Sequence, residues 1–260
     1  MALNEHNLFY KSEICTLIQN DSLKVLEDIK PESIDMIFAD PPYFLSNNGI
    51  TCQNGEMVSV NKGSWDRLSD NGTSIEEKHK FNRKWIKLCK KVLKPNGTIW
   101  ISGTMHNIYS VGMALEQEGF KIINNITWQK TNPPPNLACR CFTHSTETIL
   151  WAQKNDKKSH HFFNYELMKT LNAGKQMKDV WTGSLTKPSE KKCGKHPTQK
   201  PEYLLERIIQ ASTVPGDIVL DPFCGSGTTG VVANRLGRNF IGIDLSEEYL
   251  QITKKRLEAI

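Results

Sequence analysis

The chain has 260 residues, of which 38% are hydrophobic and 23% are charged, so its composition excludes a disordered protein and provides for a substantial core. The net charge is +5, no apolar run approaches the roughly 18 residues that cross a bilayer, and residues 1–7 lack the features of a secretory signal. The seven cysteines are scattered, and Cys139 and Cys141 have no second pair that would complete a zinc site or a disulfide framework. These features predict a soluble cytosolic protein without a metal site.

Short apolar runs alternate with longer helical patterns, which predicts an α/β fold with a mostly parallel sheet. In chain order the expected elements are a strand at Ile14–Ile18, a helix at 22–29, a strand at Ile34–Ala39, a helix at 75–93, a strand at Thr98–Ser102, a helix at 106–118, strands at Ile122–Trp128 and Thr148–Ala152, a helix at 202–212, a strand at Ile218–Leu220, a helix at 227–237, a strand at Phe240–Ile243 and a helix at 246–258. Lys94-Pro95-Asn96-Gly97 is expected to stop the helix at 75–93.

Two stretches do not follow this alternation. Residues 44–74 are rich in Asn, Gly and Ser and are too long for an ordinary connection, which predicts a functional or mobile loop. Residues 152–201 contain eleven lysines and four acidic residues, a net charge of +7, whereas the rest of the chain carries −2. This segment is either a solvated face or a surface that follows phosphates. The expected division is a main domain of 1–152 and 196–260 with a basic insertion at 153–195.

A glycine-rich loop near the C-terminus follows one predicted strand and opens a predicted helix. Gly225, Gly227 and Gly230 fit the pattern G-x-G-x-x-G, which lets the backbone turn tightly and brings a ligand against a helix start. The next strand ends at Asp244, where a carboxylate can accept hydrogen bonds from both ribose hydroxyls. The glycines alone could form a plain turn, but the strand, the helix and the acidic strand end together predict a nucleoside site.

The position of the glycine loop favours S-adenosylmethionine over a dinucleotide. A dinucleotide site normally opens its domain, but only sixteen residues follow Asp244, so the rest of the sheet must come from earlier in a circularly permuted chain. Asp221, which ends the preceding strand, would repel a pyrophosphate but suits the ammonium group of a methionine moiety. A dehydrogenase that binds NAD is the rival interpretation.

The tetrapeptide Asp40-Pro41-Pro42-Tyr43 directly follows the strand expected at Ile34–Ala39. Ligands of open α/β sheets bind at the carboxyl ends of strands, and the prolines restrict the directions of the Asp40 side chain and the Pro41 carbonyl. These two acceptors match the two N–H groups of an exocyclic amine on a planar base, and Tyr43 could stack on the ring. An Asx turn is the alternative for the tetrapeptide alone, but beside a methionine-nucleoside site it predicts amine methylation.

Asp40-Pro41-Pro42-Tyr43 together with Asp221-Pro222-Phe223-Cys224-Gly225-Ser226-Gly227 resembles the DNA amino-methyltransferases that act on adenine N6 or cytosine N4. The order of catalytic motif, basic segment and cofactor loop is similar to that of the β group. This resemblance implies a circularly permuted Rossmann-like, S-adenosylmethionine-dependent methyltransferase fold with a small basic DNA-recognition insertion. Asp at the first motif position fits adenine, because the cytosine-N4 enzymes commonly carry Ser there.

Residues 39–46 and 125–132 look more specifically like the second adenine methyltransferases of DpnII-type restriction systems. This likeness implies a prokaryotic cytoplasmic enzyme that methylates GATC and also accepts single-stranded DNA. The implied partners are DNA, a second copy of the chain in a homodimer, and a cognate restriction endonuclease that need not touch the enzyme. No membrane partner is expected.

The expected cofactor site combines loop chemistry with this resemblance. Asp244 should hold the ribose, and Asp21 should either contact the cofactor's adenine or cap the helix at 22–29. In His196-Pro197-Thr198-Gln199-Lys200-Pro201 the resemblance places Thr198 and Lys200 near the methionine end. The predicted set is Asp21, Thr198, Lys200, Asp221, Phe223, Gly225, Ser226, Gly227, Thr228 and Asp244.

The expected reaction is a direct methyl transfer that needs no metal. Hydrogen bonds to Asp40 and the Pro41 carbonyl would aim the lone pair of adenine N6 at the methyl group, so the main contribution is positioning. The target base must be flipped out of a duplex, a cost that single-stranded DNA largely escapes. Trp65 and Asp66 would close over the flipped base, or Trp65 would only anchor its loop.

DNA contacts are expected in two segments. Lysines of 154–195, among them Lys187, Lys191 and Lys192, would contact phosphates and set position rather than sequence. Polar side chains that can read or support bases lie at Asn132, Asn136 and Arg140, although a polar loop without DNA contact is an equal alternative. Two other functions stay open: methylation of RNA or of cytosine N4 in DNA, and a non-catalytic module that binds cofactor and DNA.

Overall fold

The computed structural model describes residues 8–44, 50–53, 56–59, 74–157 and 159–260, and Trp65 and Asp66 lie outside these ranges. Its main sheet has nine strands in the order β1-β2-β11-β10-β3-β6-β8-β7-β9. Their bounds are β1 Leu8–Lys11, β2 Cys15–Gln19, β3 Ile34–Ala39, β6 Leu93–Gly103, β7 Phe120–Lys130, β8 Thr146–Lys154, β9 Val180–Gly183, β10 Ile218–Asp221 and β11 Asn239–Asp244. Two further strands, β4 (Ile50–Gln53) and β5 (Glu56–Ser59), form a separate antiparallel pair.

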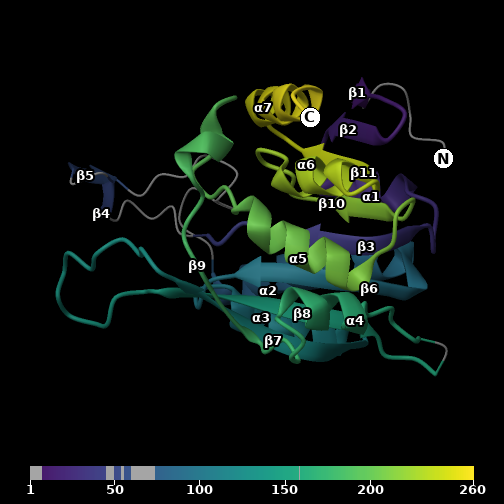
Figure 1. Ribbon diagram of the computed structural model, residues 1–260, viewed down its shortest axis with the longest axis horizontal. Coiled ribbons are helices and arrows are strands. Elements are labelled where there is room, and N and C mark those ends of the chain that lie inside the picture. Colours follow the sequence, from purple (N-terminus) through teal and green to yellow (C-terminus); the bar gives the residue numbers. More distant parts are fainter. Residues whose placement is uncertain (1–7, 45–49, 54–55, 60–73, 158) are drawn as a thin grey trace.

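Helices cover both faces of the main sheet, and each face has its own buried cluster (Figure 1). One layer consists of α1 (Ser22–Asp28), α2 (Ile75–Val92) and α3 (Ile108–Gln117). The other consists of α4 (Tyr165–Leu171), α5 (Glu202–Ser212), α6 (Thr228–Arg235) and α7 (Glu247–Glu258). Side chains of β3 point alternately to the two faces of the sheet. Ile37 and Ala39 pack in the cluster under the first helical layer, and Met36 and Phe38 pack in the cluster under the second. No helix in the described part of the chain is long and apolar enough to cross a bilayer.

The last two strands of the chain occupy the middle of the sheet. Strand β10 pairs in parallel with both β11 and β3, and β11 pairs in parallel with β2, so the N-terminal strands flank the C-terminal pair. This order confirms the predicted circularly permuted Rossmann-like fold. Because β2, β11, β10, β3 and β6 are parallel, their carboxyl ends meet at one edge, which is where ligands bind in such sheets.

The sheet is less parallel than the sequence pattern predicts. Strand β8 pairs antiparallel with both β6 and β7, and β1 pairs antiparallel with β2. No helix separates β7 from β8, so their connection, residues 131–145, allows antiparallel pairing; it extends away from the sheet in Figure 1. The outer strands are thus mixed around a parallel centre.

The predicted end of the helix before Lys94-Pro95-Asn96-Gly97 is confirmed, because α2 ends at Val92. The next strand was expected to begin at Thr98, but β6 begins at Leu93 and includes these four residues. Leu93 pairs with Ile34, and the register of β6 against β3 shifts before Met36. The Lys94 ammonium also forms an ion pair of 2.7 Å with Asp35. Pairing with β3 therefore overrides the local turn signal.

The lysine-rich segment 153–195 is attached to the main sheet. It contributes α4, which packs against α5, and β9, which pairs in parallel with β7, as well as the short 3-10 helix η3 (Pro188–Lys191). The sequence pattern did not predict these elements, since each is at most seven residues long. The assignment of this segment to target recognition stays a prediction.

Candidate active site

A cavity of about 700 Å³ opens where the carboxyl ends of the parallel strands meet. This volume suits a ligand of nucleoside size. The predicted residues that line it are Asp21, Asp40, Pro42, Thr198, Lys200, Asp221, Phe223, Gly225, Ser226, Thr228 and Asp244. The fold therefore gathers the two motifs, which lie at opposite ends of the sequence, around one cavity.

The glycine loop is shaped by two residues with left-handed backbone conformation. Gly225 has φ of 52° and Gly227 has φ of 72°, and a Cβ at Gly227 would collide with the Thr253 side chain of α7. The Gly225 N–H donates to Asp244 Oδ2 at 2.8 Å, and the Ser246 N–H donates to Asp244 Oδ1 at 2.8 Å. Asp244 is thereby fixed at the rim of the cavity, and burial raises its pKa.

Asp221 is the most deeply buried acid of the cavity, with 2% of its surface exposed. Its Oδ2 accepts from the Thr229 hydroxyl at 2.6 Å, and its Oδ1 accepts from the Phe223 N–H at 3.0 Å. Burial raises the pKa of Asp221 to about 7, and the nearby carboxylates of Asp40 and Asp244 add to that shift. A cationic ligand would compensate this cluster of acids, which fits the positive charges of S-adenosylmethionine better than a pyrophosphate.

Another part of the cavity lining combines an acidic helix cap with aromatic rings. Asp21 is the N-cap of α1 and accepts from the Leu23 N–H at 2.8 Å, so the capping interpretation is confirmed. Its contact with a cofactor adenine stays a prediction, which the cap does not exclude. Phe223 packs edge-on against Trp85, with ring centroids 5.5 Å apart, and contacts Phe81 of α2, which also lines the cavity.

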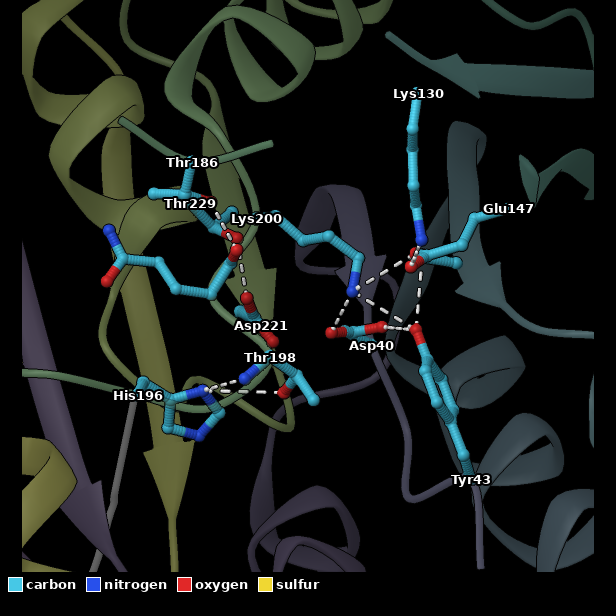
Figure 2. Close-up of polar contacts among 12 residues, drawn as sticks. Asp40, Tyr43, Lys130, Glu147, Thr186, His196, Thr198, Lys200, Asp221 and Thr229 are labelled. Carbon is cyan, nitrogen blue, oxygen red and sulfur yellow. Dashed lines mark hydrogen bonds and ion pairs between the residues drawn. The ribbon is translucent and has the colours of Figure 1, made fainter. Parts of the chain in front are cut away.

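Asp40 directly follows β3, and each of its carboxylate oxygens contacts a different side chain (Figure 2). One carboxylate oxygen accepts from the Tyr43 hydroxyl, and the other forms an ion pair of 2.5 Å with the Lys200 ammonium. Tyr43 is 5% exposed, and burial, reinforced by Asp40, raises its pKa well above the usual value, so the phenol keeps its proton. Stacking of this ring on a target base stays a prediction.

Lys200 also contacts Glu147 of β8, with Nζ and Oε2 3.5 Å apart, and Glu147 forms an ion pair of 2.7 Å with Lys130 of β7. Burial alone would lower the pKa of Lys200, but Asp40, Tyr43 and Glu147 outweigh it and raise this pKa well above the usual value. Burial likewise opposes the charge of Glu147, but Lys200 and Lys130 hold its pKa below the usual range. These shifts keep both Lys200 and Glu147 charged near neutral pH.

The backbone of the tetrapeptide is fixed by a chain of buried hydrogen bonds from the first helical layer. The Asn107 amide donates to the Pro42 carbonyl at 3.1 Å. Asn82 of α2 donates to Asn107 Oδ1 at 2.7 Å and accepts from the Trp85 indole at 3.1 Å. Asn82 is fully buried and Asn107 is 1% exposed, so this chain holds the end of β3 rigidly.

The segment that contains Thr198 forms one wall of the cavity. The Thr198 N–H donates to Nδ1 of His196 at 3.3 Å, and the His196 ring meets the Tyr249 ring of α7 edge-on, with centroids 4.3 Å apart. A Cβ at Gly225 would lie 3.1 Å from His196 Nε2, so this ring packs closely on the glycine loop. These contacts make His196 part of the cavity wall.

The two expected DNA segments are brought together beside the cavity. Asn132 accepts from the Leu185 N–H at 2.9 Å, which fastens the start of loop 131–145 to the stretch that leads to Lys187. Asn136 is used within its own loop, because its amide donates to the Cys141 carbonyl at 2.7 Å and its oxygen accepts from the Ala138 N–H at 3.1 Å. Of the four basic residues predicted by number, Arg140, Lys187 and Lys192 are exposed, whereas Lys191 is half-buried. Base and phosphate contacts stay predictions.

Sequence reasoning missed Glu147, Lys130, Asn107 and Phe81. Glu147 is one of two charged residues in the strand Thr146–Lys154, and nothing local linked it to Asp40. Phe81 lies within the amphipathic helix α2, where an apolar residue is expected anyway. Asn107 directly precedes α3, where a polar residue is common.

Comparison with known proteins gives consistent matches over most of the chain. The DNA methylase family of N6- and N4-methyltransferases matches residues 34–255. The chain is 70% identical to the Type II methyltransferase M2.LlaDCHI of Lactococcus lactis subsp. cremoris, over 99% of this chain and 97% of that protein. It is 72% identical to the Type II methyltransferase M2.DpnII of Streptococcus pneumoniae, over 96% of this chain and 92% of that protein.

Solved structures share the fold. The crystal structure of an M1.HpyAVI–SAM complex is 31% identical, with a TM-score of 0.68, and the match covers 94% of this chain and 98% of that chain. The PvuII DNA methyltransferase, described as cytosine-N4-specific, has a TM-score of 0.74 at 22% identity, over 95% of this chain and 87% of that chain. The latter likeness concerns the fold alone.

Proposed function

The chain belongs to the DNA methylase family of N6- and N4-methyltransferases, and from this membership we propose that it transfers a methyl group from S-adenosylmethionine to adenine N6 within GATC. It acts as the modification enzyme of a restriction–modification system. The observation that carries the proposal is the single cavity that holds both the buried Asp221 with its glycine loop and the acceptor Asp40. A methyl donor and an amine can meet there at the ends of adjacent strands β10 and β3.

When bound, S-adenosylmethionine supplies an electrophilic methyl group on a sulfonium. Asp221 provides negative charge where the cationic methionine end would lie, and Asp244 provides acceptors for the ribose hydroxyls. Phe223 offers an aromatic wall for the cofactor's adenine. The residues fit this cofactor because an acidic, half-aromatic cavity matches a ligand that is cationic at one end and aromatic at the other.

Asp40 and the Pro41 carbonyl accept the two N–H groups of the target amine. These hydrogen bonds favour a pyramidal nitrogen whose lone pair points at the methyl group, and the rigid end of β3 supplies the positioning. Asp40 need not be a strong base, since the methylated ammonium is acidic enough to lose its proton after transfer. Adenine rather than cytosine is the proposed base because the first motif position is Asp.

The proposal extends to three finer points. Single-stranded DNA is a substrate, because an unpaired adenine needs no flipping out of a duplex. A restriction endonuclease of the same specificity works beside the enzyme without forming a complex with it. The active protein is a homodimer, which light scattering at the assay concentration tests directly.

The deciding experiment is transfer of labelled methyl from S-adenosylmethionine to matched oligonucleotides that contain GATC or a scrambled tetranucleotide. Each is offered as duplex and single strand, with an RNA copy as control, and digested products are identified by nucleoside mass spectrometry. The proposal expects N6-methyladenine in GATC-containing DNA and no label in RNA. Label in N4-methylcytosine would overturn the base assignment, label in every DNA would overturn the sequence assignment, and cofactor binding without any transfer would indicate a non-catalytic module.

A further inference from the structure

A row of buried side chains with alternating charge extends behind the proposed acceptor. It begins at Asp40, continues through Lys200 and Glu147, and ends at Lys130, with ion pairs of 2.5, 3.5 and 2.7 Å (Figure 2). The side chains of the four are only 7 to 14% exposed. They come from the end of β3, the loop that precedes α5, β8 and β7, so three strands and a loop meet at this row.

Buried charges are costly unless each is paired and hydrogen-bonded. Here each is paired; Glu147 Oε1 accepts a hydrogen bond from Lys130, whereas its Oε2 only faces the Lys200 ammonium without a hydrogen bond. The Lys200 ammonium has three protons and faces three acceptors: Asp40 Oδ2 at 2.5 Å, Tyr43 Oη at 3.1 Å and Glu147 Oε2 at 3.5 Å. Glu147 would be left with one partner if Lys130 were absent, and Lys200 would be drawn to Asp40 alone if Glu147 were absent. The position of the Lys200 ammonium therefore depends on its attraction to both carboxylates, Asp40 and Glu147.

The contacts of the Asp40 carboxylate determine which hydrogen bonds it can still accept. An ionised carboxylate only accepts hydrogen bonds, whereas a protonated one also donates and would compete with the N–H groups of the target amine. Lys200 and Tyr43 each take one lone pair of Asp40, one on either oxygen, which leaves a second lone pair on each oxygen and fixes the plane of the group. The carboxylate is thus held ready to accept from a substrate.

We propose that Glu147, held by Lys130, is a positioning residue for methyl transfer: it sets where Lys200 contacts Asp40 and so keeps the Asp40 carboxylate in one orientation. The inference rests on the proposed function, in which Asp40 accepts from the target amine. A purely structural ion pair between β7 and β8 would support folding alone, and would leave the rate and pH dependence of a folded variant unchanged.

The test compares Glu147→Gln with Glu118→Gln. Glu118 is a matched control because its side chain is 10% exposed and it forms a 2.7 Å ion pair with Arg83, whereas the Glu147 side chain is 11% exposed and forms a 2.7 Å ion pair with Lys130. The measurements are the single-turnover methylation rate from pH 6 to 10, the affinity for S-adenosylmethionine and the melting temperature.

Glu147→Gln is expected to lower the single-turnover rate by about 10- to 100-fold through misplacement of Asp40. Cofactor affinity should change by less than about threefold, because Glu147 does not line the cavity. The alkaline limb of the pH–rate profile should move to lower pH, since Lys200 loses one of the negative charges that keep it protonated. Glu147→Asp should restore the pH profile, and Glu118→Gln should alter neither rate nor profile.

Three outcomes are decisive. If folded Glu147→Gln keeps the rate and pH profile of Glu118→Gln while Asp40→Ala is inactive, the inference is wrong and the proposed function stands. If Asp40→Ala itself keeps near-normal turnover, the proposed acceptor is wrong. If Glu147→Gln does not fold, Lys130→Met carries the test: a smaller rate loss with the same shift of the alkaline limb supports the inference, and an unchanged folded enzyme overturns it.

Discussion

Asp40 is held by one donor three positions away and another 160 positions away in the chain. The near donor, Tyr43, is part of the motif that the sequence displays, whereas the far one, Lys200, belongs to a stretch that resemblance assigned to the cofactor. Lys200 lines the cavity, and its ammonium contacts Asp40 directly. For single residues, the proposed function therefore depends on the positions of the buried charges of Asp40, Lys200 and Asp221.

Replacing Asp40 by Ala should reduce methyl transfer by at least about 100-fold, because the target amine loses an acceptor that positions its lone pair. The affinity for S-adenosylmethionine should change little, since the glycine loop and Asp244 remain in place. Single-turnover transfer and equilibrium cofactor binding measure the two effects separately. A lower melting temperature is also expected, as Lys200 loses its 2.5 Å partner; near-normal turnover would contradict the assignment.

Asp221→Asn should raise stability at alkaline pH. Burial raises the pKa of Asp221 from 3.8 to about 7, so the folded protein keeps a proton that the unfolded chain has lost. Between about pH 4 and 7 the unfolded state binds fewer protons, and the stability of the wild type therefore falls as pH rises through this window and levels off above it. The difference in melting temperature, variant minus wild type without ligand, should grow from pH 5 to pH 8. A difference independent of pH would show that Asp221 does not titrate there.

At the scale of elements, the C-terminal helix α7 fixes the glycine loop. Arg256, 7% exposed, donates to the Ser226 carbonyl at 2.8 Å and to the Thr228 hydroxyl at 2.9 Å, and it forms an ion pair of 2.9 Å with Glu202 of α5. Thr253, one turn earlier, donates to the Gly225 carbonyl at 2.9 Å. The glycines would allow this loop many conformations, but the contacts with α7 hold it in a single conformation. Sequence reasoning predicted α7 only as the last helix and gave it no role in the site.

Arg256→Met should therefore destabilise the protein and weaken cofactor binding together. The Ser226 carbonyl and the Thr228 hydroxyl lose their donor, at a cost of about 1–3 kcal/mol, whereas Glu202 keeps a 2.7 Å ion pair with Arg235. Lys254→Met is the control, because Lys254 lies on the same helix, its side chain is 38% exposed, and its 3.8 Å pair with Glu258 contributes little. Thermal unfolding and calorimetric titration with S-adenosylmethionine provide the comparison; equal behaviour of the two variants would contradict this role for α7.

Across the whole molecule, the basic segment and the cavity lie next to each other because the chain folds back repeatedly between them. The Thr186 hydroxyl donates to the Gln199 carbonyl at 2.5 Å, and the Gln199 amide donates to the Glu190 carbonyl at 2.9 Å. The turn that carries Lys200 is therefore fastened to η3 and its lysines. A DNA strand whose phosphates lay on this segment would have a base within reach of the cavity.

The triple variant Lys187→Gln, Lys191→Gln, Lys192→Gln should weaken DNA binding and flatten its salt dependence. Each lost phosphate contact lowers the slope of log K against log salt by about 1, so the slope should decrease by up to about 3. The control replaces Lys80, Lys84 and Lys87, exposed on the outer face of α2, by Gln. Fluorescence anisotropy over a salt series tests both, and an unchanged slope in the first variant would exclude this segment as the phosphate surface.

The sequence by itself determined the class of fold, the two motifs and the reaction, because strand periodicity, glycines at a helix start and an Asp-Pro-Pro-Tyr strand end are local patterns with local physical causes. It also predicted the permutation, since too few residues follow Asp244 to complete a sheet. Strands such as Ile34–Ala39 were predicted with their observed bounds, because buried apolar residues on both faces leave few alternatives.

Only the tertiary structure decided what surrounds Asp40. The residues around it are distant in sequence and carry no local mark of function: Lys200, Glu147, Lys130 and Asn107. Their arrangement depends on the order β3-β6-β8-β7 and on the loop that precedes α5. The direct passage from α2 into β6 likewise depended on pairing with β3, which outweighed a local turn signal. Periodicity and motifs predict the environment of a residue within its own helix or strand. The ion pairs around Asp40 join residues from strands that are distant in the sequence and become neighbours only when the chain folds.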